Sequence, residues 1–332
     1  MKIGLFYIAV SLFFLAYIGV NFYIFRAGYR ILPENRVLKI IYISSALLLL
    51  VSFITGRILE KIYLCFFTDT LITIGSFWFA FMLYLFISIL FIDAIKRINK
   101  YITIIPSLIT NNMIKAKYIT ATFIFFFVSI LVFAGYLNAK NFRIHKIPLA
   151  ISKKNATHKS IKIILITDIH LGTLISNGHL KKMTESINSL KPDVVLLGGD
   201  IVDEDIYPVI KRNMGYHLTK INATYGVYAI TGNHEFIGGV ESSVKFLEDH
   251  NIKVIRDSHV QIKDIITIIG REDKSSKRFN NKSRKPLKDI LSTINKKLPI
   301  IVLDHQPVGI DEAIKNNIEI NLSGHTHAGQ LW

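Results

Sequence analysis

Four long apolar segments in the first 140 residues constrain this 332-residue chain more than any other feature. They are residues 3–25, 37–55, 71–92 and 119–136. A helix needs about 20 apolar residues to cross the hydrocarbon core of a bilayer, so each segment has nearly the length of a span. We therefore predict an integral, multi-pass membrane region of about four spans over residues 1–140, in contact with membrane lipids.

The orientation of these spans follows from lysine and arginine, which accumulate in cytoplasmic loops. The loops after the first and third spans share one side and contain nine such residues, at 26–39 and 96–117. The amino terminus, the loop after the second span and the segment after the fourth contain six. This bias predicts that residues 141–332 lie on the extracytoplasmic side of the cell membrane.

The net charge and the cysteine content limit the classes of partner and ligand that this chain is expected to have. The formal net charge is +16, and a membrane surface is a simpler partner for it than a nucleic acid. No aromatic residues interleave with a basic cluster in the polar half, so we predict no nucleic-acid binding. The single cysteine, Cys65, leaves no internal disulfide and no thiolate ligand for residues 141–332.

Residues 141–332 alternate between strand-like and helix-like segments, which is typical of a layered α/β domain. The expected strands are 142–151, 161–167, 194–197, 226–230, 252–255, 262–269, 300–303 and 318–322, with a hairpin turn at 152–159. The expected helices are 178–189, 209–220, 241–251, 286–296 and 309–316, and 272–285 is expected to be a charged surface loop.

Short polar blocks follow five of these strands. They are Asp168-Ile169-His170, Gly199-Asp200, Gly232-Asn233-His234-Glu235, His305 and Gly324-His325-Thr326-His327. Ligand sites of open α/β sheets form beyond the carboxyl ends of strands, so these blocks are expected to converge. Oxygen and imidazole ligands without thiolate suit manganese, iron or zinc. Two such ions about 3.5–4 Å apart can clamp the attacking and leaving oxygens of a phosphoryl displacement. The pattern therefore predicts two divalent metal ions and a metal-dependent phosphoesterase.

The order D-x-H, G-D, G-N-H-E, H and G-H-x-H, from Asp168 to His327, is similar to the calcineurin-like metallophosphoesterase superfamily. With its amino-terminal spans, the chain resembles the transmembrane proteins with a metallophosphoesterase domain. The resemblance implies a layered β-sandwich flanked by helices over residues 141–332. Related domains continue after the last motif, whereas this chain ends five residues after His327, so we expect either a domain truncated at its carboxyl terminus or a sheet that ends early.

The resemblance also implies a role for each residue. Asp168, His170 and His327 would bind the first metal ion, and Asn233, His305 and His325 would bind the second. Asp200 would bridge the two ions, and a hydroxide held between them would attack phosphorus in line. His234 would face the phosphate or protonate the leaving oxygen, and Glu235 would orient His234.

Arg271 is the candidate substrate-binding residue, because it follows an expected strand and a guanidinium can bind a phosphate through two hydrogen bonds. The alternative for Arg271 is a solvated loop arginine.

The membrane spans favour a phosphorylated substrate that is itself linked to a lipid, since tethering raises the rate of encounter with groups in the bilayer. Relatives in the superfamily hydrolyse UDP-2,3-diacylglucosamine, which makes it the leading specific candidate. That lipid would be cytoplasmic, so a domain outside the membrane would better suit an undecaprenyl-type lipid or a phospholipid headgroup. The alternative function is a non-catalytic membrane scaffold or receptor that retains the fold.

Overall fold

The computed structural model describes residues 2–151 and 160–327. It divides the chain into two compact units, Met1–Phe142 and Arg143–Trp332. The expected hairpin turn at 152–159 lies outside the described residues. Each unit has an interior of its own, and the two interiors are built on different principles.

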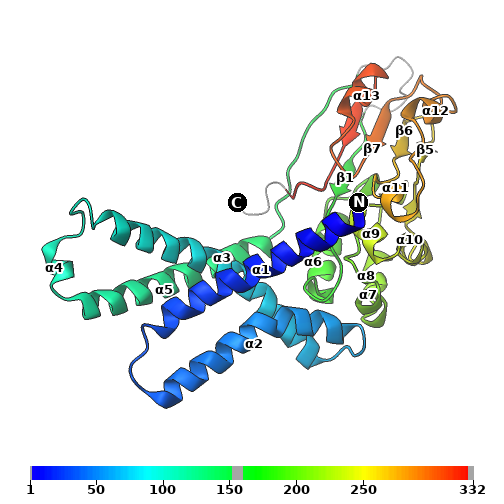
Figure 1. The fold of residues 1–332 in the computed structure, drawn as a ribbon. Coiled ribbons are helices and arrows are strands. Elements are labelled where there is room, and N and C mark those ends of the chain that lie inside the picture. Colours follow the sequence, from blue (N-terminus) through cyan, green and yellow to red (C-terminus); the bar gives the residue numbers. More distant parts are fainter. Residues whose placement is uncertain (1, 152–159, 328–332) are drawn as a thin grey trace. The chain divides into compact units, whose positions relative to one another are not determined.

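The first unit is entirely helical over its described residues (Figure 1). Its helices are α1 (Lys2–Tyr29), α2 (Arg36–Glu60), α3 (Phe66–Ile98), α4 (Ser107–Thr110) and α5 (Met113–Ala139). Four of them, all except α4, are long and apolar enough to cross a membrane. Each of the four contains one of the apolar segments that the sequence indicated.

A small polar cluster lies inside this helical unit. Asn21 of α1 is 1% exposed, and its amide oxygen accepts a hydrogen bond from the indole nitrogen of Trp78 on α3 at 2.9 Å. The amide nitrogen of Asn21 donates to the backbone carbonyl of Tyr17 at 2.8 Å. The ring of Trp78 stacks on Phe25 with 5.3 Å between centroids. These contacts fasten α1 to α3 by hydrogen bonds that do not depend on exclusion of water.

The second unit contains two four-stranded sheets. The first consists of β1 (Ile163–Ile166), β2 (Val194–Gly198), β3 (Val227–Ile230) and β4 (Lys253–Val254), in that order and all parallel. The second consists of β5 (Ser258–Ile262), β6 (Ile266–Gly270), β7 (Ile300–Leu303) and β8 (Ile320–Leu322), also in chain order. Only the β5–β6 pair of the second sheet is antiparallel.

Alternation along the strands builds a layered core, because successive side chains of a strand point to opposite faces. In β2, Val194 and Leu196 join the cluster between the two sheets, whereas Val195 and Leu197 join the cluster that packs against helices. In the second sheet, Ile301 and Leu303 of β7 face the first sheet. The predicted β-sandwich flanked by helices is confirmed.

Helices cover the outer faces of both sheets (Figure 1). The chain forms α6 (Asn177–Ser189), α7 (Tyr207–Lys211), α8 (Gly215–Leu218), α9 (Asn233–Gly238), α10 (Val240–Asp249), α11 (Ser276–Phe279), α12 (Leu287–Leu291) and α13 (Ile310–Lys315). Leu180, Leu218 and Phe246 pack against the first sheet, and Leu287 and Ile290 pack against the second.

Three local predictions of secondary structure were wrong. Residues 142–151 form no strand, because Pro148 lacks a donor and the apolar alternation slips between Ile144 and Ile147. The expected strand 262–269 is a hairpin of β5 and β6, which turns at Lys263 with φ 45°. The expected helix 209–220 divides into α7 and α8, because Asn213 has φ 50° between them.

The segment 272–285, expected to be a charged surface loop, is partly internal. It contains α11, and Asp273 and Ser276 are 1% and 2% exposed. The carboxylate of Asp273 accepts hydrogen bonds from the side chain of Gln306 and from the backbone of Ser275. The high charge of the segment therefore reflects internal pairing as well as solvation.

Candidate metal centre

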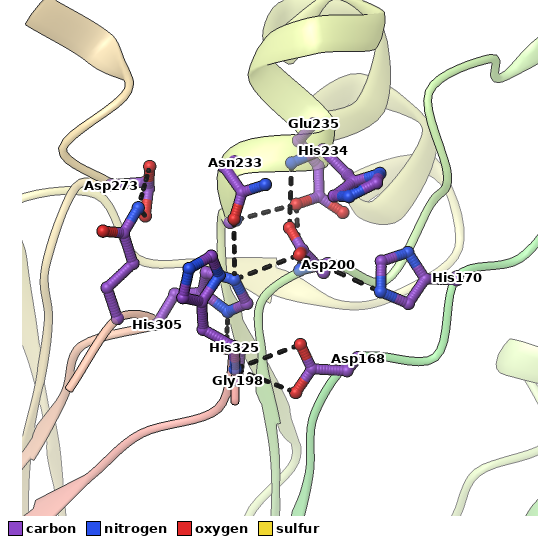
Figure 2. Close-up of polar contacts among 12 residues, drawn as sticks. Asp168, His170, Gly198, Asp200, Asn233, His234, Glu235, Asp273, His305 and His325 are labelled. Atoms are coloured by element: carbon purple, nitrogen blue, oxygen red, sulfur yellow. Dashed lines mark hydrogen bonds and ion pairs between the residues drawn. The ribbon is translucent and has the colours of Figure 1, made fainter. Parts of the chain in front are cut away.

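The five polar blocks meet where five strands end. Asp168 and His170 follow β1, Asp200 follows β2, and Asn233 begins α9 three residues after β3. His305 follows β7, and His325 and His327 follow β8. Both sheets contribute, so the site is assembled across the sandwich from segments up to 157 residues apart (Figure 2).

One group of possible metal ligands consists of Asp168, His170 and His327, whose donor atoms all lie within 4.8 Å of one another. The Nε2 atoms of the two histidines are 3.4 Å apart, and His327 Nε2 is 3.4 Å from Asp168 Oδ1. Asp168 also accepts hydrogen bonds from the backbone N–H of His325, which ties β1 to the loop after β8.

A second group consists of Asp200, His305 and His325. His305 is 0% exposed, and its Nε2 is 3.1 Å from Asp200 Oδ2 and 3.2 Å from the amide oxygen of Asn233. The other ring nitrogen of His305, Nδ1, donates to the carbonyl of Gly198 at 2.9 Å. That hydrogen bond leaves Nε2 as the nitrogen that faces the site.

Asp200 links the two groups. Its Oδ2 lies 3.1 Å from His305 and 3.9 Å from His170, while Oδ1 accepts the backbone N–H of His234 at 2.9 Å (Figure 2). Burial raises the pKa of Asp200, but the hydrogen bond and charge of His305 outweigh it, so the pKa lies below its ordinary value. Burial lowers the pKa of His305, but Asp200 raises it to about 9. The ionised Asp200 carboxylate is therefore stabilised by a positive charge at His305.

The backbone at this site adopts conformations that most residues avoid. Asp168, His170, Asp200, His325 and His327 all have φ between 48° and 69°. Non-glycine residues seldom occupy this left-handed region, and such strain clusters at functional sites. Gly199 has φ 91°, and a Cβ atom there would come within 2.7 Å of His305 Nδ1. The strand ends are thus bent sharply, which turns their side chains toward a common point.

His234 lies beside the two groups and has a carboxylate partner of its own. Its Nδ1 is 3.0 Å from Asp203 Oδ1, and its ring centroid is 4.5 Å from that of His170. The hydrogen bond to Asp203 raises the pKa of His234 above its ordinary value, against the opposing effect of burial. Asp203 was missed by the sequence analysis, although it follows Asp200 by three residues in the loop after β2.

We expected Glu235 to orient the ring of His234, but the side chain of Glu235 has other partners. Its carboxylate is 0% exposed and accepts four backbone N–H groups, those of Asp200, Ile201, Val202 and Gly232, at 2.7–3.0 Å. Burial raises the pKa of Glu235 despite these donors. Glu235 therefore holds the loop after β2 against α9, and the ring of His234 is held by Asp203.

Arg271 is not among the residues that converge on the metal centre. Its side chain is 3% exposed, and its Nη2 donates to the backbone carbonyl of Lys285 at 2.9 Å. Its Nε lies 3.7 Å from Asp257 Oδ1. Both interpretations of Arg271 from the sequence assumed an accessible side chain, whereas the structure buries it in the wall of a separate cavity.

The donor set fits divalent cations. Carboxylate oxygens, imidazole nitrogens and one amide oxygen are the ligands that manganese, iron and zinc accept in proteins. Asp200 Oδ2 of the second group approaches His170 of the first at 3.9 Å, and a third possible group, His170, Asp203 and His234, shares His170 with the first. Together these groups supply enough donors for more than one ion.

The family follows from sequence comparison. A family model described as calcineurin-like phosphoesterase matches residues 161–329, which include every residue of the metal centre. The chain therefore belongs to the calcineurin-like phosphoesterase family. Members of this family use divalent metals.

Individual relatives agree with this assignment. The chain is 32% identical over 191 residues to an uncharacterized metallophosphoesterase of Helicobacter pylori, covering 57% of this chain and 50% of the relative. It is 30% identical over 210 residues to one from Aquifex aeolicus, covering 62% of this chain and 78% of that one. A Danio rerio transmembrane protein with metallophosphoesterase domain is 27% identical over 215 residues, covering 61% of this chain and 49% of that protein.

The chain spans about half the length of several curated relatives that it matches. Among solved structures, a 5′-nucleotidase precursor from Thermus thermophilus is 17% identical, with a TM-score of 0.37 over 50% of this chain and 42% of that one. The four apolar helices and the relatives named as transmembrane proteins support a membrane protein.

Proposed function

We propose that this protein is a membrane-anchored phosphoesterase that hydrolyses a phosphoester or pyrophosphate bond with the help of two divalent metal ions, manganese, iron or zinc. The observation that carries the proposal is the pair of three-residue ligand groups joined by Asp200. In this assignment Asp168, His170 and His327 hold one ion, and Asn233, His305 and His325 hold the other.

Bound divalent ions would supply Lewis-acid charge for the phosphoryl group and would lower the pKa of a water molecule. The protein would supply the proton for the leaving oxygen and hold the proton donor in place. With Nδ1 of His234 directed at Asp203, Nε2 is the nitrogen that can deliver a proton to the leaving oxygen. The hydrogen bond to Asp203 raises the pKa of His234 above its ordinary value, which favours the protonated ring and suits a general acid.

Glu235 acts in this proposal as a positioning residue. By accepting the backbone N–H groups of Asp200, Ile201 and Val202, it fixes the loop that carries both Asp200 and Asp203. A loss of Glu235 would thus move a metal ligand and the partner of the general acid together.

The test is hydrolysis of bis-p-nitrophenyl phosphate by the full chain in detergent, first freed of metal and then supplied with Mn²⁺. We expect turnover that requires the metal and that falls by about a thousandfold or more in Asp200→Asn, which weakens both ligand groups. We expect His234→Ala to lower kcat by about 10²–10⁴-fold. The matched control is Asp249→Asn, since Asp249 is an exposed acid that pairs with Lys245 on the surface of α10. Turnover that needs no metal, or that survives in Asp200→Asn, would contradict the proposal.

A non-catalytic scaffold or receptor is the alternative. Proteins that keep a fold and lose its chemistry usually lose ligands, whereas all seven predicted ligand positions and His234 are present here. Binding of metal without turnover on any phosphoester would favour the scaffold.

The finer proposal is a lipid-linked substrate, with UDP-2,3-diacylglucosamine as its specific candidate. Its support is the membrane unit, because a tethered domain meets lipid-borne phosphates more often than free ones. Comparing hydrolysis of that lipid with hydrolysis of an undecaprenyl-type pyrophosphate in the same mixed micelles tests it. Equal rates on both lipids and on their water-soluble headgroups would contradict a lipid preference.

For topology we propose four spans with the catalytic domain on the extracytoplasmic side. The nine basic residues of the loops at 26–39 and 96–117 support this orientation. In a Cys65→Ser background, a cysteine placed at the exposed position Lys282 should react with a membrane-impermeant maleimide in intact cells. Labelling only after lysis would place the domain in the cytoplasm.

A further inference from the structure

A cavity lies in the α/β unit, and none of its lining residues belongs to the metal centre. Its volume is about 250 Å³, well above the ~15 Å³ that a single water molecule needs. It is lined by Arg271, Lys274, Arg284, Lys285, Pro286, Val308, Gly309 and Glu312. Four of these eight residues are cations and one is an acid, so the surface of the cavity is strongly positive. We call it the basic cavity.

Two guanidinium groups in its wall have donors with no acceptor. The Nε atoms of Arg271 and Arg284 are buried and make no hydrogen bond within the described structure. Arg271 is 3% exposed, and the carboxylate oxygen that faces its Nε, on Asp257, is 3.7 Å away, too far for a hydrogen bond. Buried donors are nearly always satisfied in native proteins, so the two guanidinium groups that line this cavity are short of acceptor oxygens.

The cations are held in place by acids that lie behind them. The terminal nitrogens of Arg284 donate to both oxygens of Asp304, which is 6% exposed. Arg271 is held through the carbonyl of Lys285, whose backbone N–H in turn donates to Asp257 at 2.6 Å. Burial, and then the positive charge of Arg284, lower the pKa of Arg271. Glu312 on the cavity wall lies 3.9 Å from Arg271 Nη2 and offsets part of the repulsion between the two guanidinium groups. An anion bound in the cavity would offset more of it.

The basic cavity is close to the metal centre along the chain. Asp304, which anchors Arg284, is the residue directly before His305. Gln306, directly after His305, donates to Asp273 in the same segment as Lys274. Val308 and Gly309 continue this strand-end loop into the cavity wall. A molecule at the metal centre would therefore have a second anion site nearby on the same loop.

We propose that the basic cavity binds a phosphoryl group other than the one that is hydrolysed. The preferred substrates are then molecules that carry two phosphoryl groups, an extension that rests on the proposed function. Arg271 and Arg284 would contact the oxygens from the buried wall, and the exposed Lys274 and Lys285 would contact them from the mouth.

The binding test uses the full chain in detergent with EDTA, so that the metal centre takes no part, and inorganic pyrophosphate as the probe in isothermal titration calorimetry. We expect one site in the wild type and an affinity about tenfold lower in Lys274→Gln/Lys285→Gln, which removes two charge-assisted contacts. This double variant leaves the buried pairs intact. Arg271→Lys keeps the charge but removes the fork and Nε, and it should weaken binding similarly. Lys288→Gln, an exposed change on α12 outside the cavity, is the control and should bind as the wild type does.

A kinetic test separates a substrate phosphoryl group from a free phosphate. With Mn²⁺ present, phosphate release is compared for alkanediol bisphosphates of increasing length and for the matching monophosphates. We expect one length to have a KM about tenfold below its monophosphate, and we expect the double variant to abolish that advantage.

Absence of pyrophosphate binding in EDTA, or equal binding by the double variant, would overturn the inference whatever the catalytic result. Binding without any bisphosphate advantage would overturn the substrate assignment and would identify the cavity as a site for free phosphate. Failure of the proposed function appears differently, as no hydrolysis of any phosphoester with the binding result unchanged.

Discussion

The two units of this protein use apolar residues in opposite ways. In the helical unit, large apolar side chains point outward, with Leu15 66% exposed and Phe123 67% exposed. In the α/β unit, the four apolar side chains of β2 from Val194 to Leu197 are 0% exposed. The first unit is therefore suited to a lipid solvent and the second to water. Hydrophobic burial can stabilise only the second, while packing and hydrogen bonds must hold the first together.

We expect metal binding to produce the largest difference in stability between the two units. A ligand that binds only the folded state stabilises it by about 4 kcal/mol when its concentration is a thousand times Kd. We expect Mn²⁺ at that level to slow hydrogen exchange by about a thousandfold in the strands of the α/β unit and to leave α1–α5 unchanged. Hydrogen-exchange mass spectrometry of peptides from both units measures this. Equal protection of both units would show that their stabilities are coupled.

Deleting an apolar side chain should have opposite outcomes in the two units. Leu196→Ala opens a cavity between the sheets and should destabilise the α/β unit by about 3 kcal/mol. Phe123→Ala removes a larger side chain that lipid would contact in both states, so its cost should be under about 0.5 kcal/mol. Denaturant titration of the full chain in lipid nanodiscs gives both values. A cost for Phe123→Ala as large as that for Leu196→Ala would place α5 inside a protein core.

Within the α/β unit, Asp203→Asn tests whether the partner of the general acid matters beyond stability. Loss of an outer partner typically costs about 10–100-fold in activity, and we expect kcat to fall by that much. Asp203 raises the pKa of His234, and the protonated ring is the active form in the proposed function, so we expect activity to be lost as pH rises through this pKa. The variant should therefore lose activity at lower pH than the wild type. A pH profile with an unmoved alkaline limb would reject the Asp203–His234 pair.

The smallest effect is expected for the polar cluster of the helical unit. Asn21→Ala removes the acceptor of the Trp78 indole and should destabilise the bundle by about 1 kcal/mol, in line with hydrogen bonds between membrane helices. Unfolding followed by the fluorescence of Trp78, in a Trp332→Phe background, measures the change. Leu48→Ala, at a half-exposed position of α2, is the control and should be neutral. An equal loss in both variants would mean that the cluster contributes nothing specific.

Composition and local pattern were sufficient to predict the membrane helices, several strands and the family. Runs of about 20 apolar residues can only be helices in a membrane, because backbone groups have no other partners there. The strands that precede Asp168, Asp200, Asn233 and His305 were apparent from short apolar runs, since a strand covered on both faces must be apolar throughout. The motif order indicated the family because each motif is local.

Which side chains contact one another depends on the packing of the folded chain. Glu235 and Asp203 are both acids near His234. Only the bend of the loop after β2 places Asp203 against the ring of His234 and brings the backbone N–H of Asp200 to Glu235. Arg271 follows a strand as the ligands do, yet it lines a cavity away from the metal centre, although β6 pairs with β7, the strand that leads to His305. Trp78 belongs to an aromatic run but turns inward to Asn21, which is 57 residues away. Pairing at such separations depends on packing of whole elements, and residue type and spacing do not record it.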